Sequence, residues 1–304
     1  MRVLILGGYG FVGSNLADAL IERGNEVRIF DKTGADNSRI NHLSGKVEIL
    51  EGDFAVASDA SRALKGMEAV VHLACTTIPA TSNKDPIYDV ETNLVGTIQL
   101  LDQTLKYKIR RFVFASTGGA VYGPPQKMPI AEDHPTYPIS SYGIHKLIIE
   151  KYLSVYEKLH GLNWVALRPS NPYGKRQRPD TGQGAATAFA HAMKLGKEIT
   201  IWGDGSVVRD YIHISDLARA YAMALERETP SRIYNIGTGK GTNLKELVKL
   251  LAKVSGIKPK VRYGPARPYD VPSNALDCSR AKKELGWEPT ISLEEGLREY
   301  FEED

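Results

Sequence analysis

Tyr142 and Lys146 stand four residues apart in a stretch, 141–159, whose residue pattern predicts a helix. Side chains at i and i+4 share one helix face, with their Cβ atoms about 5–6 Å apart. A phenol has a pKa of about 10, too high for a base at neutral pH, and a neighbouring ammonium lowers it. The pair therefore has the composition of a general base and its electrostatic partner, with Tyr142 taking a proton from a substrate hydroxyl. Because the spacing is common by chance, a solvated helix face is the alternative.

A glycine-rich segment near the start of the chain indicates a dinucleotide site. Gly7, Gly10 and Gly13 lie between an apolar run that predicts a strand and a stretch whose apolar spacing predicts a helix. Glycines let the backbone approach a pyrophosphate closely, and the phosphate then rests against the helix N-terminus. Phe11 and Val12, between the glycines, are expected to contact the same cofactor.

An acidic residue at the end of the second predicted strand supports this interpretation. Asp31 follows Gly13 by 18 residues, close to the spacing of about 20 that is typical of a ribose-binding carboxylate. Because a carboxylate would repel a 2′-phosphate, the acid favours NAD over NADP, while Lys32 beside it leaves NADP open. A structural glycine turn, with Asp31 as a turn residue, is the alternative.

Further cofactor contacts are expected where later strands end. Asp53 is predicted to hydrogen-bond adenine or to serve only as a turn carboxylate, and Phe54 follows it. The strand predicted at 69–74 ends in small residues, so that a cofactor can pass Leu73 and Ala74.

Strands and helices alternate through the first part of the chain, which predicts a parallel doubly wound sheet. The predicted strands are 2–6, 26–30, 47–50, 69–74, 111–115 and 163–167, and the predicted helices are 14–23, 58–65, 93–106 and 142–160. After Arg168 the alternation gives way to a long loop, 169–184, rich in Pro, Gly, Arg and Asn. A helix at 185–194, a strand at 199–202 and helices at 244–255 and 279–285 are predicted beyond it.

We therefore expect an α/β fold of the Rossmann type, a doubly wound parallel sheet with a smaller C-terminal substrate-binding lobe. The predicted NAD-binding domain is 1–168, to which part of 206–234 returns. The predicted substrate-binding lobe is 169–205 together with 235–304.

Composition excludes several functional classes. Charged residues make up 25% of the chain, the formal net charge is only +3, and Lys and Arg form no single block, which argues against a nucleic-acid partner. No apolar run reaches the roughly 20 residues that a membrane-spanning helix needs, and residues 1–6 are interpreted as a first strand, not a signal peptide. Cys75 and Cys278 make neither a disulfide framework nor a metal site, and two reduced thiols in a cytoplasmic protein is the favoured interpretation.

Ordered motifs along the whole chain resemble the extended short-chain dehydrogenase/reductase family and, within it, the NAD-dependent nucleotide-sugar epimerases. The resemblance is carried by Gly7/Gly10/Gly13, Asp31, Asp53, 72–74, Asn93, 116–123, Tyr142/Lys146, 171–174, 209–211, 235–239, Arg267 and Asp270. It implies a tightly bound NAD that takes a hydride from a UDP-sugar and returns it to the other face of a transient 4-keto sugar.

The resemblance also implies roles for individual residues. Tyr142 would be the base, Lys146 its electrostatic partner and a ribose contact, and Thr117 or Ser116 a proton relay. Asn93 would belong to the cofactor site. The implied substrate contacts are Thr117, Asn171, Arg209, Arg267, Asp270 and Asn274, with the two arginines on the diphosphate, for which bidentate guanidinium groups are suited.

One position departs from the family. Many relatives carry Ser or Thr four residues before the Tyr of the Val-Tyr-Gly ending, and here that residue is Gly118. Thr117 is therefore favoured over Ser116 as the relay, with a purely structural role for both hydroxyls as the alternative. Sugar 4,6-dehydratases have an Asp-Glu pair in this segment and decarboxylases a Glu. Since Gly118 and Gly119 have no side chain for such chemistry, epimerisation is the hypothesis and dehydration is disfavoured.

The substrate and the partners are less closely defined. Asn274 resembles the residue whose bulk limits the C2 substituent in UDP-galactose epimerases, so N-acetylated sugars are expected to fit. Lys175, Arg176 and Arg178 leave a UDP-glucuronate 4-epimerase open. A reductase or dehydratase of the same family and a non-catalytic NAD-binding regulator are the other readings. The helices at 93–106 and 142–160 resemble those that pair in a homodimer.

Overall fold

The computed structural model describes residues 1–180, 184–267 and 271–302. Asp270, one of the expected substrate contacts, lies outside these ranges.

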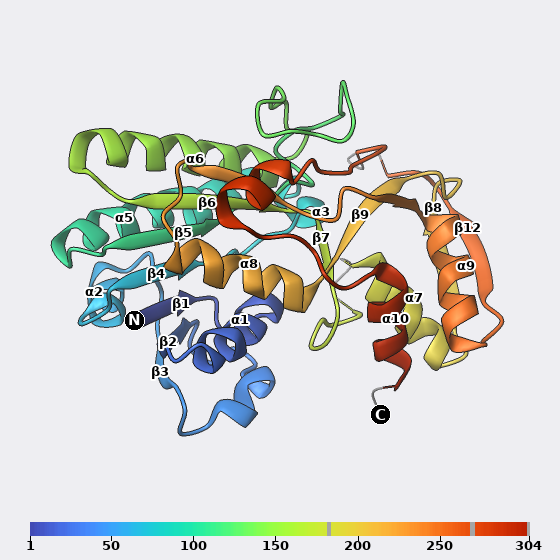
Figure 1. The fold of residues 1–304 in the computed structure, drawn as a ribbon, viewed down its shortest axis with the longest axis horizontal. Helices are drawn as coiled ribbons and strands as arrows, with labels where there is room; N and C mark the ends of the chain where they lie inside the picture. Colours follow the sequence, from blue (N-terminus) through green and yellow to red (C-terminus); the bar gives the residue numbers. More distant parts are fainter. Residues whose placement is uncertain (181–183, 268–270, 303–304) are drawn as a thin grey trace.

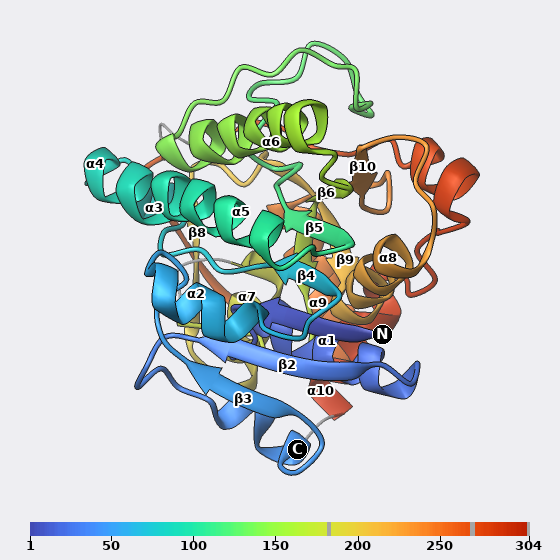
Figure 2. The same ribbon diagram turned by 90° about the vertical axis from the view of Figure 1, so that its left-hand side faces the viewer.

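A seven-stranded sheet forms the centre of the larger lobe (Figures 1 and 2). Its order is β10-β6-β5-β4-β1-β2-β3, and every neighbouring pair is parallel. The strands are β1 Arg2–Leu6, β2 Glu26–Asp31, β3 Glu48–Glu51, β4 Ala69–His72, β5 Arg111–Ala115, β6 Trp164–Pro169 and β10 Ile233–Ile236. Strand order reverses at β1, which lies between β2 and β4, and α/β sheets bind ligands beyond the carboxyl ends of the strands at such a point.

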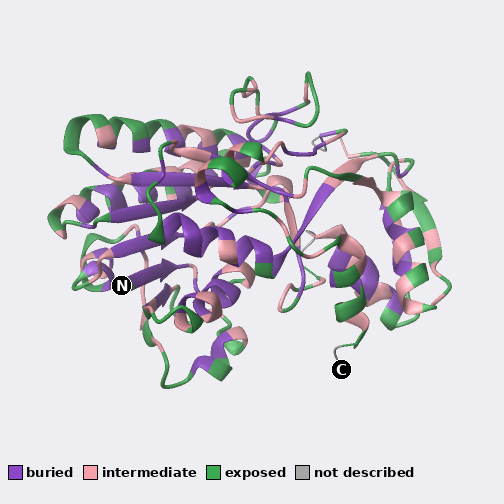
Figure 3. Cartoon of the chain, in the orientation of Figure 1, coloured by how far each residue is buried: buried purple, intermediate pink, exposed green. Residues whose placement is uncertain are grey.

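Helices cover both faces of this sheet because its strands are apolar on both sides. Val3 and Ile5 of β1 belong to one buried cluster, and Leu4 and Leu6 belong to another. Helices α1 (Phe11–Glu22) and α8 (Ile214–Glu226) cover the first face. Helices α2 (Ala57–Leu64), α5 (Gly96–Lys106) and α6 (Ser141–His160) cover the second. Figure 3 shows the central strands as mostly buried and the outer helix surfaces as exposed.

The smaller lobe has a core of its own and lies on the right in Figure 1. Its helices are α7 (Ala185–Lys194), α9 (Leu244–Ser255) and α10 (Leu293–Glu302). Strands β8 (Glu198–Trp202) and β12 (Lys260–Gly264) form a parallel pair. Strand β9 (Val208–His213) pairs with β7 (Asn171–Tyr173) and β11 (Gly241–Asn243), in the order β11-β9-β7.

Short elements complete the described part of the chain. They are a 3-10 turn at Ser38–Leu43, helices α3 (Pro79–Ser82) and α4 (Pro86–Asp89), and π-helical turns at Val90–Val95 and Ala281–Leu285. Among the residues that the structure describes, no helix is both long enough and apolar enough to cross a bilayer.

The predicted fold class, a Rossmann-type parallel sheet with a smaller lobe, is confirmed. The predicted helix at 93–106 begins later, at Gly96, because Val90–Val95 is π-helical, and α1 begins earlier than predicted, at Phe11. The segment that returns to the larger lobe contributes α8 and β10, and β10 runs on to Ile236, past the expected boundary at 235. Trp287, assigned by sequence to the substrate lobe, packs in the core beside α1 and α8.

Candidate active site

The glycine loop joins β1 to α1 at the switch point of the sheet. Gly7 has a φ of +86°, and a Cβ there would lie 2.8 Å from the backbone nitrogen of Ala74, so only glycine fits between the two strand ends. A Cβ on Gly13 would lie 2.3 Å from the Gly7 oxygen. Gly10 is the N-cap of α1 and supplies no side-chain cap. The first amides of α1 are therefore available to an anion, as the sequence pattern predicts.

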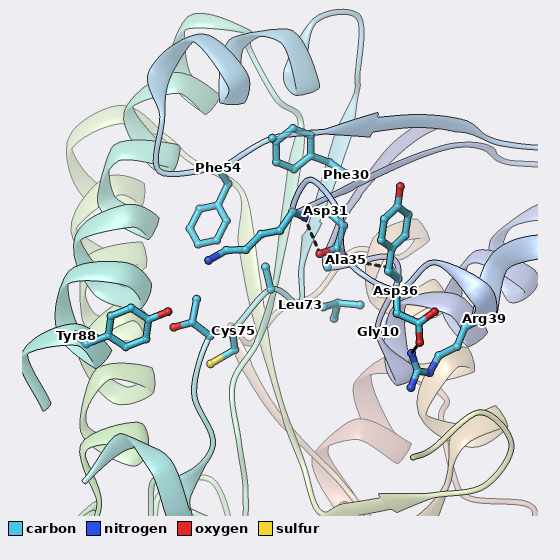
Figure 4. Close-up of a pocket in the computed structure, with 16 residues that line it drawn as sticks. Gly10, Phe30, Asp31, Ala35, Asp36, Arg39, Phe54, Leu73, Cys75 and Tyr88 are labelled. Atoms are coloured by element: carbon cyan, nitrogen blue, oxygen red, sulfur yellow. Dashed lines mark hydrogen bonds and ion pairs between the residues drawn. The ribbon is translucent and has the colours of Figure 1, made fainter. Parts of the chain in front are cut away.

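A cavity of about 460 Å³ lies beside this loop (Figure 4). Its lining includes Gly7, Gly10, Asp31, Lys32, Phe54, Leu73 and Ala74, seven of the expected cofactor contacts. The Asp31 carboxylate accepts hydrogen bonds from the amides of Tyr9 (2.8 Å) and Lys32 (2.9 Å). Burial raises the pKa of Asp31 above its ordinary value, although the two amides oppose that shift. A half-buried acid at the end of β2 suits a ribose diol and disfavours a phosphate.

Three expected cofactor contacts, which do not line this cavity, have structural roles. Asp53 accepts a hydrogen bond from the amide of Ala55 at 2.9 Å, which is the turn role given above as its alternative. Its neighbours Gly52 and Phe54 line the cavity. Asn93 accepts the amide of Thr76 at 2.9 Å and so holds the loop after β4. Phe11, the first residue of α1, packs against the apolar core.

Helix α6 brings Tyr142 and Lys146 together at the carboxyl end of β5. Ser140 caps the helix by accepting the amide of Gly143 at 3.2 Å, so Tyr142 lies in the first turn. The Lys146 ammonium donates to the carbonyl oxygen of Ala115 at 2.8 Å and lies 5.7 Å from the centre of the Tyr142 ring. The two side chains thus share one helix face, and the ammonium is held in place by the end of β5.

The electrostatic balance at Tyr142 differs from the expected one. Burial, with smaller contributions from groups that include Cys75 and Asp89, raises the pKa of the Tyr142 phenol. Burial also lowers the pKa of the Lys146 ammonium. Among the protein's own groups, burial has the largest effect on the phenol and raises its pKa, so the lowering expected from Lys146 does not prevail. Further positive charge beside the ring is needed before the phenol can act as a base at neutral pH.

Ser116 is committed to a buried ion pair. Its hydroxyl donates to the Glu150 carboxylate at 2.5 Å. Arg168 binds the same carboxylate through two nitrogens, at 2.9 and 2.6 Å, and donates to the Tyr122 hydroxyl at 2.9 Å. Ser116, Glu150 and Arg168 are all at most 3% exposed. The Ser116 hydroxyl therefore serves the core and is poorly placed to pass a proton to a substrate.

Gly118 lacks a side chain because Leu276 occupies the space. A Cβ on Gly118 would lie 2.5 Å from Leu276 Cδ1 and 3.0 Å from the Arg168 carbonyl oxygen. Asn274 donates from Nδ2 to the Gly118 carbonyl oxygen at 2.8 Å and so fixes the loop that carries Thr117. Leu276 occupies the space that a side chain at 118 would need, and the Ser116 hydroxyl is bound to Glu150. Thr117 is half-buried, and its hydroxyl makes no hydrogen bond with the described residues.

Two of the expected substrate contacts, Asn171 and Arg209, lie on strands of the smaller lobe, and Arg267 follows β12. Asn171 of β7 pairs in register with Tyr211 of β9. Within the described residues, Asn171 Oδ1 and the Tyr211 hydroxyl are buried and find no hydrogen-bond partner. Arg209 donates to the carbonyl oxygen of Val271 at 2.6 Å, and the Arg267 guanidinium stacks 4.7 Å from the Trp202 ring. Buried polar atoms without a partner are groups that a polar ligand would satisfy.

The basic loop after β7 turns toward the larger lobe. Arg176 forms an ion pair with Asp18 of α1 and donates to the Ser14 carbonyl oxygen at 2.9 Å. Arg178 pairs with Asp180 at 3.0 Å and lies 3.9 Å from Asp36. These acids neutralise charge that would otherwise attract a sugar carboxylate.

Sequence comparison gives the family. The profile of the NAD dependent epimerase/dehydratase family matches residues 3–237. The chain belongs to this family. UDP-glucose 4-epimerase of Mycolicibacterium smegmatis is 34% identical over 307 residues, which cover 99% of this chain and 98% of that protein.

Two solved structures share the whole fold. UDP-glucose 4-epimerase of Thermotoga maritima, solved with UDP-glucose, has a TM-score of 0.94 and 38% identity, and the match covers 99% of both chains. The Thermus thermophilus UDP-glucose 4-epimerase, solved with NAD, has a TM-score of 0.92 and 35% identity, covering 100% of this chain and 99% of that one.

The residues of the chain fit the cofactor of this family. The glycine loop has no space for side chains, so only its backbone can contact a ligand. The cavity lies at the N-terminus of α1, and Asp31 lines it with a carboxylate that can accept hydrogen bonds from a ribose diol.

Sequence reasoning missed the residues that support the site. Glu150 lies four residues after Lys146, and Arg168 ends an apolar run, so two opposite charges next to buried segments were the available signal. Arg39 and Tyr88 line the cavity from a short turn and a short helix. Their positions depend on loop geometry, which sequence patterns do not specify.

Proposed function

We propose that this chain is an NAD-dependent epimerase that inverts C4 of a UDP-hexose through a transient 4-keto sugar. The observation that carries the proposal is the Tyr142–Lys146 pair, one helical turn apart beside Ala115, with Thr117 two residues beyond that strand end. The glycine loop and Asp31 would hold NAD, which would supply a reversible acceptor for the C4 hydride.

The chain's own groups handle the proton and orient the sugar. Tyr142 takes the proton of the 4-hydroxyl, and Thr117 relays it. Lys146, together with the positive nicotinamide of oxidised NAD, opposes the burial that keeps the phenol protonated. Arg209 and Arg267 are proposed to bind the diphosphate and Asn171 the sugar. Inversion requires the keto-sugar to turn over, so the two arginines must hold the diphosphate while the hexose moves.

The loop at 118–119 favours epimerisation over dehydration. A dehydratase needs an acid and a base at the sugar, and Gly118 and Gly119 offer neither. Because Leu276 fills the space next to Gly118, a carboxylate could not be accommodated there without a change in the core.

The preferred sugar has an uncharged substituent at C6. The ion pairs of Arg176 with Asp18 and of Arg178 with Asp180 weaken the case for a glucuronate carboxylate at the basic loop. At C2, Asn274 is small, which supports acceptance of an N-acetyl group as well as a hydroxyl.

Incubation of purified protein with UDP-glucose, UDP-N-acetylglucosamine or UDP-glucuronate, without added cofactor, tests the proposal. NMR of the anomeric proton should show a C4 epimer of the first two, and the Tyr142→Phe variant should show none. Turnover only with added NAD(P)H would instead identify a reductase. A 4-keto-6-deoxy product would identify a dehydratase, and NAD binding without turnover a regulator.

We also propose a homodimer formed through α5 and α6. Ile144, Tyr152, Val155 and Leu159 of α6 are exposed apolar residues at helical spacing, and they form a stripe on its outer face. Light scattering should give twice the chain mass, and Val155→Lys/Leu159→Lys should give a monomer. A wild-type monomer would refute the interface.

Cys75 and Cys278 are free thiols, which supports a reducing compartment such as the cytoplasm.

A further inference from the structure

The first turn of α6, which carries Tyr142, is docked on the segment that follows β4. The amide of Tyr142 donates to Ser82 Oγ at 3.0 Å, and the amide of Ser141 donates to Asn83 Oδ1 at 2.8 Å. Ser82 is the last residue of α3, and Asn83 is its C-cap. The orientation of the proposed base therefore depends on residues that stand 58 and 60 positions earlier in the chain.

Asp89, the last residue of α4, is the buried centre of this contact. Its side chain is fully buried. Its Oδ2 accepts a hydrogen bond from Ser141 Oγ at 2.6 Å and lies 2.9 Å from His145 Nδ1. Ser141 directly precedes Tyr142, and His145 lies almost one helical turn beyond it. One carboxylate thus holds both flanks of the proposed base.

The other oxygen of Asp89 binds the wall of the cofactor cavity. Oδ1 accepts a hydrogen bond from the Thr77 hydroxyl and lies 3.3 Å from Asn93 Nδ2. Thr76 and Tyr88, the neighbours of Thr77 and Asp89 in the chain, both line the 460 Å³ cavity, and Figure 4 shows Tyr88 on this side of it. The carboxylate therefore joins the wall of the cavity to the helix that carries the base.

His145 extends this anchor to the Tyr142 ring. Its ring is fully buried and stands edge-on to the Tyr142 ring, with the ring centres 5.3 Å apart. Although burial opposes the shift, hydrogen bonds from Ser141, Thr77 and His145 hold the pKa of Asp89 below its ordinary value. An ionised carboxylate only accepts, so Nδ1 of His145 is the donor, and the plane of the imidazole is fixed.

His145 is neutral at physiological pH. Burial, followed by the charge of Lys146, lowers the pKa of His145 to about 4, although Asp89 opposes that shift. The ring therefore packs beside Tyr142 as a fixed spacer and adds no charge to the site.

The charge of Asp89 works against the proposed base. Burial has the largest effect on the Tyr142 phenol and raises its pKa, and Cys75, Tyr221 and Asp89 act in the same direction. The Lys146 ammonium lies 5.7 Å from the centre of the ring. A buried carboxylate that disfavours the phenolate does not assist proton removal electrostatically, so its contribution to the site is a matter of position.

We propose that Asp89 is a positioning residue for Tyr142, which it holds against the cofactor cavity through Ser141 and His145. The inference rests on the proposed epimerase reaction, in which the proton of the 4-hydroxyl goes to Tyr142 while a hydride leaves C4 of the same sugar. The phenol and the cavity must therefore keep a fixed separation. A misplacement of about 1 Å is enough to lower a rate about 100-fold.

Kinetics of two acids on α4 test this position. Asp85 caps α4 through the amide of Tyr88 at 3.0 Å and is exposed, so Asp85→Asn, which keeps a capping side chain, is the matched control. Asp89→Ala should lower kcat for UDP-glucose about 100-fold, with KM and bound NAD unchanged, whereas Asp85→Asn should behave as wild type. Circular dichroism checks the fold. A folded Asp89→Ala protein with the kcat of wild type would overturn the proposal.

Two further comparisons separate position from stability and charge. His145→Asn places Nδ2 where Nδ1 stood and should keep most of kcat, whereas His145→Leu, which has no donor for Asp89, should lose it. Asp89→Asn keeps the shape and removes the anion, so the rise of its kcat with pH should begin at lower pH than in wild type. Equal kcat in both His145 variants, or an unshifted pH profile, would show that the carboxylate does not act at the phenol.

NMR follows the position of Tyr142 without turnover. The protein is labelled with ¹³C at tyrosine Cζ, and Tyr142→Phe identifies the Tyr142 signal by its absence. That signal should broaden or split in Asp89→Ala and stay single in wild type and in Asp85→Asn. An unchanged signal in folded Asp89→Ala protein would overturn the proposal even where wild type epimerises UDP-glucose. A wild type without turnover would instead refute the proposed reaction, and the NMR comparison would still decide whether Asp89 holds the phenol.

Discussion

Gly118 and Leu276 should behave as a coupled pair. A Cβ on Gly118 falls 2.5 Å from Leu276 Cδ1, about 1 Å inside ordinary carbon contact. Leu276 is fully buried, and its amide is tied to Asp210 at 3.2 Å, so it has little freedom to withdraw. Gly118 itself has no positive φ, and steric contact is therefore the only obstacle to a side chain.

The expected free energies follow from that contact. Gly118→Ala should lower the free energy of unfolding by about 1–3 kcal/mol through overpacking. Leu276→Ala should lower it by about 2–5 kcal/mol through the lost side chain and its cavity. In the double variant the new methyl occupies part of that cavity. The combined loss should therefore be smaller than the sum by about 1–2 kcal/mol.

Urea unfolding of the four proteins measures this cycle, and activity measures its consequence for the reaction. Thr117→Ala alone should lower kcat about 100-fold. In a Gly118→Ser/Leu276→Ala background, the introduced hydroxyl stands where many relatives carry one, so Thr117→Ala should cost clearly less. Stability effects that add within about 0.5 kcal/mol would refute the steric argument. A Thr117→Ala protein with full activity would refute the relay.

Three further predictions concern the buried groups. The Tyr142→Phe protein should retain its bound NAD and lose turnover. The kcat of the wild-type protein should rise with pH, because burial raises the pKa of the phenol. A flat pH profile would argue against a phenolate base. Glu150→Gln leaves the Arg168 guanidinium buried without its charged partner and should lower the free energy of unfolding by about 3–5 kcal/mol. The Tm should fall accordingly. An unchanged Tm would mean that the ion pair contributes nothing to stability. The folded pKa of His145, about 4, lies below the roughly 6.5 of an unfolded chain. The unfolded state therefore binds the proton first, and up to about 3 kcal/mol of stability present above pH 6.5 should be lost as the pH falls to 4. His145→Gln should flatten that slope, and a slope that persists unchanged would assign it to other groups.

Sequence patterns predicted those parts of the molecule that repeat locally. The apolar run 2–6, the glycine spacing and the acid after β2 each obey a rule of short range, and the structure places them as predicted. Helix α6 was predictable for the same reason, since Ser140 and Gly161 provide its ends.

Other features depended on contacts between distant segments. The role of Ser116 depends on Glu150 and Arg168, which lie 34 and 52 residues later in the chain. The loss of a hydroxyl at Gly118 is explained only by Leu276, from the C-terminal part. The burial that raises the pKa of Tyr142 depends on how many elements cover the ring, and a four-residue spacing contains no information on that.

The loop after β7 joins the two lobes on the cofactor side of the molecule. Asn15 of α1 donates to the Lys175 carbonyl oxygen at 3.3 Å, and Arg39 donates to that of Arg176 at 2.9 Å. Arg39 also lines the cavity. Separation of the lobes would have to break this anchor together with the Arg176–Asp18 ion pair. An enzyme that regenerates its cofactor in every cycle gains nothing from releasing it, and contacts that hold the two lobes together beside the dinucleotide cavity would favour its retention.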